Sequence, residues 1–397
     1  MNRNVTDSIK FVSMAAHMSF PLAGNLSEKE GFRTSRNDRN KTSKSNITFE
    51  LIRKRLQGNV KVESLFYLLL ITFLVTLISC SANKKRIFKK SRIFMDTLVT
   101  ITVVSGSEDN AEKAIENAFQ EIARLEKLTN FYSPDSEVTQ INKYAGISGV
   151  KVSPDVLDLL NKALYVSENT GGVFDITIGP LESLYDFHNK IKPEASLLKK
   201  YIPLVNYRAL TIDGNESVVF LREKGMLIDP GGIAKGYAAD KAVEVLKKNG
   251  IGSGIVAVAG DIKTFGHKPD GNPWKIGIRH PRGKDGEDDV MATIELSDMA
   301  ISTSGDYERF FFLEGIRYHH ILSPKTGHPA GECRSVTVIA KEGASADAFA
   351  TGIFVLGPEE GMKVLNKMGF EGVIVDGEGN LHTTPGIRGK IEFKKSS

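Results

Sequence analysis

Residues 227–240, which read LIDPGGIAKGYAAD, constrain the fold more than any other stretch of this chain. The apolar residues at its start predict the end of a buried strand, which Asp229 terminates. Gly231 and Gly232 follow a proline in a turn that tolerates only small or φ-restricted residues. From Ile233 onward, apolar side chains recur at helical spacing. The stretch therefore predicts a strand, a carboxylate, a glycine turn and a helix in direct succession.

This turn has the properties of an anion-binding site. Unpaired N–H groups at a helix start attract negative charge, glycines allow close approach to the backbone, and Lys235 can bind a phosphate oxygen. The spacing is not that of a Walker A loop, because Lys235 precedes Gly236, and it is not the dinucleotide fingerprint, because Ile233 breaks the glycine pattern. On shape alone, an ordinary tight turn is an equally good interpretation.

The composition is that of a globular protein with a sizeable core. Hydrophobic residues make up 41% and charged residues 25% of the 397 residues. The net charge of +4 is too small to indicate nucleic-acid binding. Long runs of antiparallel strand patterns are mixed with a few helical ones, which predicts an α+β fold of mixed, largely antiparallel sheets with flanking helices and disfavours a doubly wound sheet.

The first eighty residues differ from the rest. Residues 1–60 are rich in Asn, Ser, Lys and Arg, and we interpret them as a disordered extension or as the product of a start codon assigned too far upstream. Residues 61–80 include an apolar run that is too short for a membrane span of about 20 residues. The run ends in LISC, which is similar to a bacterial lipobox. This predicts a lipoprotein signal peptide and lipidation at Cys80.

A lipid at Cys80 would make the chain a membrane-anchored lipoprotein that faces the periplasm or another extracytoplasmic side. The alternative is an uncleaved membrane anchor, which the basic residues that follow would favour, because positive charge usually stays inside. We expect residues 81–93 to form a basic tether and residues 94–393 to form the catalytic domain. With Cys80 modified, Cys333 has no partner, and no disulfide framework exists.

A second candidate site lies in the predicted helix at 344–356. Asp347 and Thr351 are four residues apart, so their oxygens project from one helix face. A carboxylate and a hydroxyl suit a hard cation such as Mg²⁺. On spacing alone, a plainer interpretation is favoured, in which Asp347 complements the helix dipole and Thr351 packs.

Adjacent histidines form a third candidate site. His319 and His320 lie on a predicted strand, where neighbouring side chains face opposite sides, so at most one of them shares a site. That one could transfer a proton. The alternative is a buried histidine held by a hydrogen bond. Asp175 lies among apolar residues and needs a partner or a ligand.

Taken together and in order, several motifs resemble a known family. They are FMDT, FYSPDSE, GGVFDITIGPL, IDPGGIAKGYAADKA, AGDI, ISTSGDYERFF, HHILSPKTGHP and SVTVIAKEGASADAFATGIFVLG. Over about residues 93–385, the chain resembles the FAD:protein FMN transferases, the ApbE-like flavin transferases. The resemblance implies a T-fold-related architecture and Mg²⁺-dependent transfer of FMN from FAD to a Ser or Thr hydroxyl of an acceptor protein, with release of AMP.

The resemblance also implies roles for individual residues. His320 and Lys235 would be catalytic, and Mg²⁺ would be bound by the Gly232 carbonyl, Asp347 and Thr351. Ala350 stands where some members have an acidic ligand, and Ser323 stands where Asp is commoner. The implied FAD contacts are Met95, Tyr132, Val173, Phe174, Asp175, Asp229, Lys235 and Leu322.

The family further suggests a membrane redox subunit with a short Ser/Thr flavinylation motif as the acceptor. Two alternatives stay open. One is a FAD pyrophosphatase, in which water is the acceptor and the products are FMN and AMP. The other is a flavin-binding lipoprotein without catalysis, which retention of Asp347, Thr351 and His320 disfavours.

Overall fold

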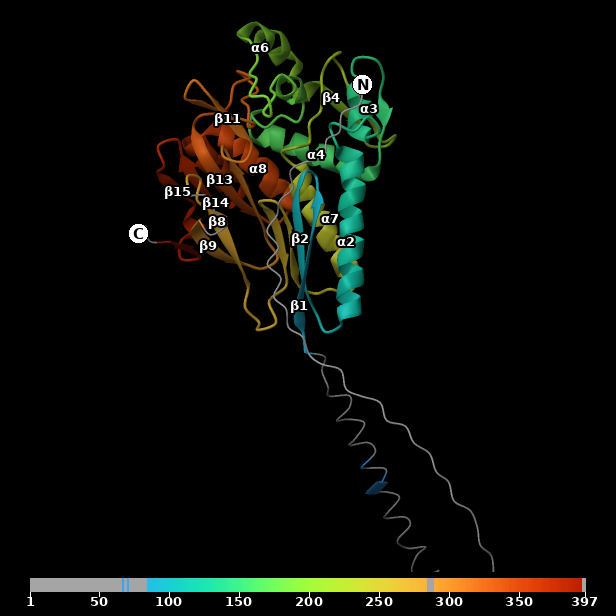
Figure 1. Ribbon diagram of the computed structural model, residues 1–397. Coiled ribbons are helices and arrows are strands. Elements are labelled where there is room, and N and C mark those ends of the chain that lie inside the picture. The colour runs from blue at the N-terminus through green and yellow to red at the C-terminus, as the bar shows by residue number, and fades with distance from the viewer. Residues whose placement is uncertain (1–65, 68–69, 71–83, 284–288, 395–397) are drawn as a thin grey trace, which may run out of the picture. The chain divides into compact units, whose positions relative to one another are not determined.

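The computed structural model describes Phe66, Tyr67, Leu70 and residues 84–283 and 289–394 (Figure 1). The chain divides into two units, Met1–Ile78 and Ser79–Ser397. Apart from Phe66, Tyr67 and Leu70, the predicted extension and signal peptide, including Cys80, lie outside the described residues, so those interpretations stay predictions. Among the helices that are described, none combines the length and the apolar character needed to cross a bilayer.

The second unit is built on an eight-stranded sheet in which every pair of neighbours is antiparallel. This confirms the predicted α+β class. In spatial order, the strands are β1 (Arg86–Phe94), β2 (Thr97–Ser105), β6 (Gly254–Val258), β7 (Asp261–Phe265), β10 (Ala300–Gly305), β13 (Cys333–Ala340), β14 (Glu371–Asp376) and β15 (Leu381–Thr383).

The two faces of this sheet are covered differently. Helices and sheet share one large apolar core, in which side chains such as Ile101 and Val338 pack with Phe119 and Phe349. The helices are α2 (Glu108–Thr129), α4 (Pro154–Asn169), α7 (Ala234–Lys248), α8 (Gly343–Leu356) and α9 (Pro358–Met368).

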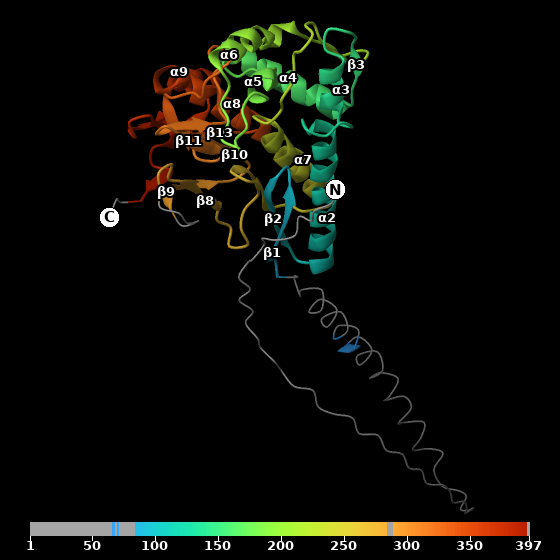
Figure 2. The ribbon, with the colours of Figure 1, turned by 45° about the horizontal axis from the view of Figure 1, so that its top comes forward.

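A three-stranded sheet forms a second core against the main sheet, with Trp274 and Ile294 beside Ile301 and Ile339. Its strands are β8 (Trp274–Arg279), β9 (Val290–Leu296) and β16 (Ile391–Phe393). Figures 1 and 2 show α2 and α7 on one side of the β1–β2 hairpin and β8 and β9 on the other.

The described chain also contains shorter elements. Two of them, Leu210–Asp213 and Val218–Leu221, form an antiparallel hairpin around Gly214. The remaining elements are α3 (Glu137–Lys143), β3 (Val150–Lys151), α5 (Gly179–Glu182), α6 (Ala195–Tyr201), β4 (Leu210–Asp213), β5 (Val218–Leu221), β11 (Phe310–Leu313), β12 (Ile316–His319) and three 3₁₀ turns, Ile202–Leu204, Tyr207–Ala209 and Pro385–Ile387.

The predicted tether at 81–93 is wrong for residues 86–93, which belong to strand β1. The basic side chains on one face of β1 pair with carboxylates that recur every four residues on α2. The basic residues that suggested a solvated tether are therefore paired with glutamates on the helix that packs against β1. The pairs are Arg86–Glu108, Lys90–Glu112 and Arg92–Glu116, with N–O distances of 3.4, 2.8 and 2.6 Å.

Residues 173–181 have the apolar composition of a strand but do not form one. The chain turns there and enters helix α5, which has Pro180 in its first turn. One oxygen of Asp175 accepts hydrogen bonds from the N–H and hydroxyl of Thr177, and the other accepts from the N–H of Tyr207. Such local side-chain bonds compete with an extended backbone. They also supply the partners that a buried Asp175 requires.

The stretch 227–240 keeps its predicted turn and helix but not its strand. Leu227 makes only an isolated parallel bridge to Ile178. The side chain of Asn142 binds both the N–H and the carbonyl of Ile228, and so replaces a neighbouring strand. Helix α7 then runs to a left-handed glycine, Gly250, at φ +79°.

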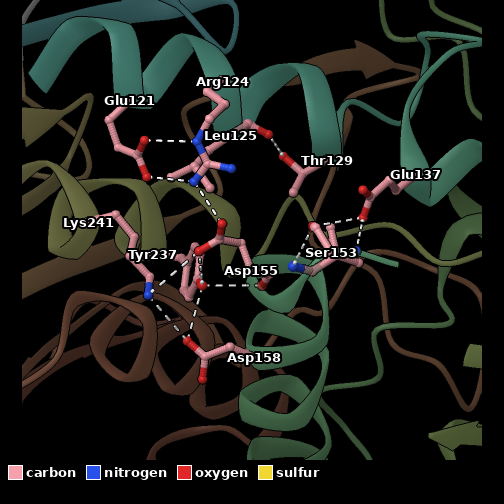
Figure 3. Close-up of polar contacts among 11 residues, drawn as sticks. Glu121, Arg124, Leu125, Thr129, Glu137, Ser153, Asp155, Asp158, Tyr237 and Lys241 are labelled. Carbon is pink, nitrogen blue, oxygen red and sulfur yellow. Dashed lines mark hydrogen bonds and ion pairs between the residues drawn. The ribbon is translucent and has the colours of Figure 1, made fainter. Parts of the chain in front are cut away.

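Polar contacts fix α4 against α2 and α7 (Figure 3). Arg124 of α2 reaches Asp155 at 2.7 Å. From α7, the hydroxyl of Tyr237 donates to Asp158 at 3.0 Å, and the ammonium group of Lys241 lies 3.7 Å from both Asp155 and Asp158. The side of α7 that faces away from the sheet is therefore held by a charged network.

Helices α7 and α8 touch through their backbones at two glycines. A Cβ added to Gly236 would lie 2.1 Å from the carbonyl oxygen of Gly343, and one added to Gly343 would lie 2.4 Å from that of Gly236. Each helix also caps the other, because Asp347 accepts from the Gly236 N–H and Asp240 accepts from the Ala344 N–H, both at 3.0 Å. These bonds satisfy N–H groups that helix starts leave unpaired.

We expect Gly236→Ala to lower the free energy of unfolding by about 2 kcal/mol or more, because the added methyl group meets backbone that cannot move aside. Gly252→Ala is the matched control, since a Cβ there meets no atom within 4 Å. Urea unfolding followed by the fluorescence of the single tryptophan measures both. Equal unfolding midpoints for the two variants would contradict the close crossing.

Candidate active site

A cavity of about 480 Å³ lies at the start of α7. Its wall combines the β1–β2 turn, the loop after α2, the turn at 173–178, the glycine turn, the end of β10 and one face of α8. The structure thus brings together every residue that the resemblance assigned to the site, although their roles stay predictions: Met95, Tyr132, Val173, Phe174, Asp175, Asp229, Gly232, Lys235, His320, Leu322, Asp347 and Thr351.

Lys235 is held by Asp261, a carboxylate to which the resemblance assigned no role. Its Nζ lies 2.5 Å from Oδ2 of the buried Asp261, whose other oxygen accepts from the hydroxyl of Ser302. Burial alone would lower the pKa of Lys235, but the charges of Asp261 and Asp347 outweigh it and raise the pKa above its ordinary value. The side chain is still 35% exposed, so a cation is fixed at the cavity wall within reach of an anion.

Gly232, Asp347 and Thr351 lie close together. A Cβ on Gly232 would be 3.4 Å from the hydroxyl oxygen of Thr351, which lies 3.1 Å from that of Ser304. Asp347 and Thr351 both face the cavity, as their spacing predicts. Burial, followed by the charge of Asp261, raises the pKa of Asp347 to about 7. Asp347 caps α7, so it does more than complement the dipole of its own helix.

These donors fit Mg²⁺ as a partial coordination set. A carboxylate, a hydroxyl and a main-chain carbonyl are hard oxygen ligands, and Mg²⁺ usually keeps waters and substrate phosphates in its remaining positions. Within the described part of the chain, there is no group of three or more His, Cys, Asp or Glu that could hold a metal by itself. The residues therefore suit an ion that is shared with a phosphate ligand, and Ala350 adds no ligand.

The two histidines occupy different surroundings, as their neighbouring positions on a strand predict. His319 is buried, donates from Nε2 to the carbonyl of Ala330 and accepts the N–H of Ile321 at Nδ1. His320 lines the cavity, and its Nδ1 lies 3.3 Å from the carbonyl oxygen of Arg309. Since a carbonyl can only accept, the proton sits on Nδ1, and Nε2 keeps a free lone pair. Burial, aided by the charge of Arg309, lowers the pKa of His320 to about 3.

Sequence reasoning missed an acidic pair in the same wall. Glu182 of α5 lies beside Asp229, which also accepts the N–H of Gly231, and Arg309 faces both. Burial, then the charge of Asp229, raises the pKa of Glu182 well above its ordinary value. Arg309 falls within a quoted motif and Glu182 directly follows another, but only folding brings them to Asp229, so no spacing could reveal the pair.

Comparison with known proteins identifies the family. The family model described as "ApbE family" matches residues 95–374. The chain belongs to the ApbE family. The FAD:protein FMN transferase of Treponema pallidum is 30% identical over 334 residues, which cover 79% of this chain and 91% of that protein. The protein of the same name from Escherichia coli K12 is 30% identical over 65% of this chain and 75% of its own length.

Solved structures of ApbE proteins agree with this assignment. The ApbE protein of Thermotoga maritima is 32% identical, with a TM-score of 0.71 over 76% of this chain and 98% of its own. The flavin transferase ApbE of Vibrio cholerae is 28% identical, with a TM-score of 0.66 over 76% and 98%. The resemblance drawn from the ApbE motifs, and the ApbE-like α+β fold that it implied, are confirmed.

We expect His319 to make stability depend on pH. Burial lowers its pKa below the ordinary 6.5, so the folded state binds fewer protons than the unfolded state. The contribution is complete above about pH 6.5 and is lost as the pH falls toward the folded-state pKa, by up to about 1.4 kcal/mol per pH unit. Urea unfolding between pH 5 and 8 tests this. The free energy of unfolding should fall more steeply at acidic pH in the wild type than in His319→Gln, which keeps every other titratable group. Parallel curves would refute this.

Proposed function

We propose that this chain transfers FMN from FAD to a serine or threonine hydroxyl of an acceptor protein and releases AMP. One observation carries the proposal: a single cavity wall holds a cationic lysine, a set of hard oxygen donors and a neutral histidine. These are the groups needed to bind a pyrophosphate, offset its charge and accept a proton from a hydroxyl. The names of the relatives, FAD:protein FMN transferase, support the choice of substrate.

In the proposed reaction, the acceptor oxygen attacks the phosphorus of the FMN half. A phosphoester bond forms, and the bond from that phosphorus to the bridging oxygen breaks, so that AMP leaves with the bridging oxygen. Lys235 would bind phosphate oxygens and offset charge that builds up on them. Because Asp261 and the α7–α8 contact fix Lys235, little reorganisation is needed as the reaction proceeds.

Mg²⁺ bound by Gly232, Asp347 and Thr351 would supply further neutralisation of the phosphate charge. This assignment is supported by the proximity of the three groups at the cavity wall. Asp347 provides the only carboxylate of the set, so the ion would depend on it. Burial and the charge of Asp261 raise the pKa of Asp347, and a cation bound at this carboxylate would lower the pKa and favour the charged form.

His320 would act as the base. Its low pKa keeps the ring neutral near pH 7, and the free lone pair on Nε2 can take the proton of the attacking hydroxyl. The hydrogen bond from Nδ1 to the carbonyl of Arg309 fixes the tautomer. The nearest competing activity is hydrolysis, in which water takes the place of the hydroxyl. A transferase must keep water from that position until the acceptor arrives.

The acceptor assay separates the two activities. We expect slow AMP release when the chain is incubated with FAD and Mg²⁺ alone, and a large acceleration when a flavin-free acceptor domain with a threonine-containing flavinylation motif is added. Intact-mass measurement should show that the acceptor gains the mass of FMN minus water. EDTA should stop the transfer until Mg²⁺ is restored. If AMP and free FMN form at the same rate with and without acceptor, and the mass of the acceptor does not change, the protein is a pyrophosphatase.

The two histidines provide an internal comparison. We expect His320→Ala to slow FMN transfer by at least about 100-fold, the usual contribution of a positioned base, without lowering the melting temperature. His319→Gln should transfer FMN at nearly the wild-type rate but melt at a lower temperature, because its ring is buried against Phe354. Similar kinetics for the two variants would remove His320 from the mechanism.

A further inference from the structure

The hairpin β11–β12 carries an exposed aromatic surface that the proposed chemistry does not use. Its two strands pair only with each other among the described strands and are joined by Glu314 and Gly315, both at positive φ. Such a two-residue turn matches the twist of an isolated hairpin. The hairpin therefore needs packing on at least one face to be stable.

One face supplies that packing. Phe311 stacks on Tyr318 with ring centroids 5.3 Å apart and lies 5.8 Å from the ring of Phe187, which in turn stacks on Tyr185. Phe311 is almost fully buried as a result. This face holds the hairpin to the segment that follows α5. On the opposite face, Phe310 and Phe312 stay partly exposed.

The opposite face presents Phe310, Phe312 and Arg317, which we call the aromatic face. The guanidinium carbon of Arg317 lies 4.0 Å from the ring centroid of Phe310 and 4.8 Å from that of Phe312. The two rings remain 36% and 54% exposed. The two rings lie 5.6 Å apart and form one apolar patch. Contiguous exposed apolar patches mark interaction sites, and aromatic residues and arginine are enriched at protein interfaces.

The aromatic face is held in place before anything binds. Nη1 of Arg317 donates to the carbonyl of Asp306 at 3.3 Å, and its Nε lies 3.9 Å from the Asp306 carboxylate. That carboxylate is buried and also receives both terminal nitrogens of Arg282, at 2.7 and 2.5 Å. A surface fixed in this way loses little conformational freedom on binding.

The hairpin is continuous with the cavity wall. Arg309 precedes β11, His320 follows β12, and both line the cavity. The backbone N–H of His320 donates to the carbonyl of Arg309 at 3.1 Å. The residue proposed to accept the proton is therefore hydrogen-bonded to the residue at the start of the hairpin. A polypeptide that brings a hydroxyl to His320 therefore comes within a few residues of the aromatic face.

We propose that the aromatic face is the docking surface for the acceptor polypeptide and binds an apolar side chain close to the hydroxyl that receives FMN. The inference rests on the proposed function and adds the surface that recognises the protein substrate. FAD would occupy the cavity, while the acceptor would meet the hairpin at its edge. A membrane surface and a second copy of this chain are the other possible occupants, and the experiment separates them.

The test measures transfer kinetics of the full chain with the flavin-free acceptor domain as the probe. We expect Phe310→Ala combined with Phe312→Ala to raise the KM for the acceptor about tenfold or more, the effect of removing interface anchors. The affinity for FAD, the slow AMP release without acceptor, and kcat at saturating acceptor should stay at wild-type values. Phe312→Tyr, which keeps the ring, should retain most of the wild-type affinity for the acceptor.

Leu381→Ala is the matched control, because Leu381 is 50% exposed on β15 and does not line the cavity. It should leave the KM unchanged. An unaltered KM in the double variant, or equal losses in KM and FAD affinity, would overturn the inference. So would a double variant that keeps its KM but loses binding to phosphatidylglycerol vesicles or loses a wild-type dimer. If the wild type itself adds no FMN to the acceptor, the proposed function fails instead.

Discussion

The contact between Gly236 and Gly343 is the constraint on which the site depends. Two helices can meet backbone to backbone only where neither has a side chain, and here both helices do so in their first turns. That approach lets Asp347 of α8 cap α7 while Asp240 of α7 caps α8. As a result, the start of α7, with Lys235, and the start of α8, with Asp347, form one rigid unit. Both residues line the cavity.

Electrostatic balance within this unit explains how charges persist in a buried place. An isolated ion in an apolar interior is costly, but Lys235 lies against Asp261, and Asp347 lies near both. His320 is buried beside the positive charge of Arg309 and takes the neutral form instead. The same wall therefore holds one group fixed as a cation and another fixed as a neutral base, and the difference comes from which neighbours each has.

The parts of the fold and site that depend on local pattern could be predicted from the sequence. The turn at Gly231 and Gly232, helix α7 and the shared face of Asp347 and Thr351 follow from spacing alone. Contacts between distant segments could not be predicted in this way. The basic residues of β1 looked solvated because their partners lie on α2, and Asp175 looked like part of a strand because the Tyr207 N–H that binds it lies in another segment. Glu182 and Arg309 became site residues only through folding.

Strand β1 also bears on the distance between the cavity and a lipid at Cys80. If Cys80 carries a lipid, as the sequence predicts, only six residues lead from the anchor to Arg86, and a chain of that length spans at most about 20 Å. The nine residues of β1 then extend for about 30 Å and deliver the chain to Met95 at the rim of the cavity. Three ion pairs hold that strand against α2, so the strand would act as a rigid spacer. The cavity would then lie within about 50 Å of the bilayer. The enzyme would reach acceptor hydroxyls within that distance of the membrane and not those farther out in solution.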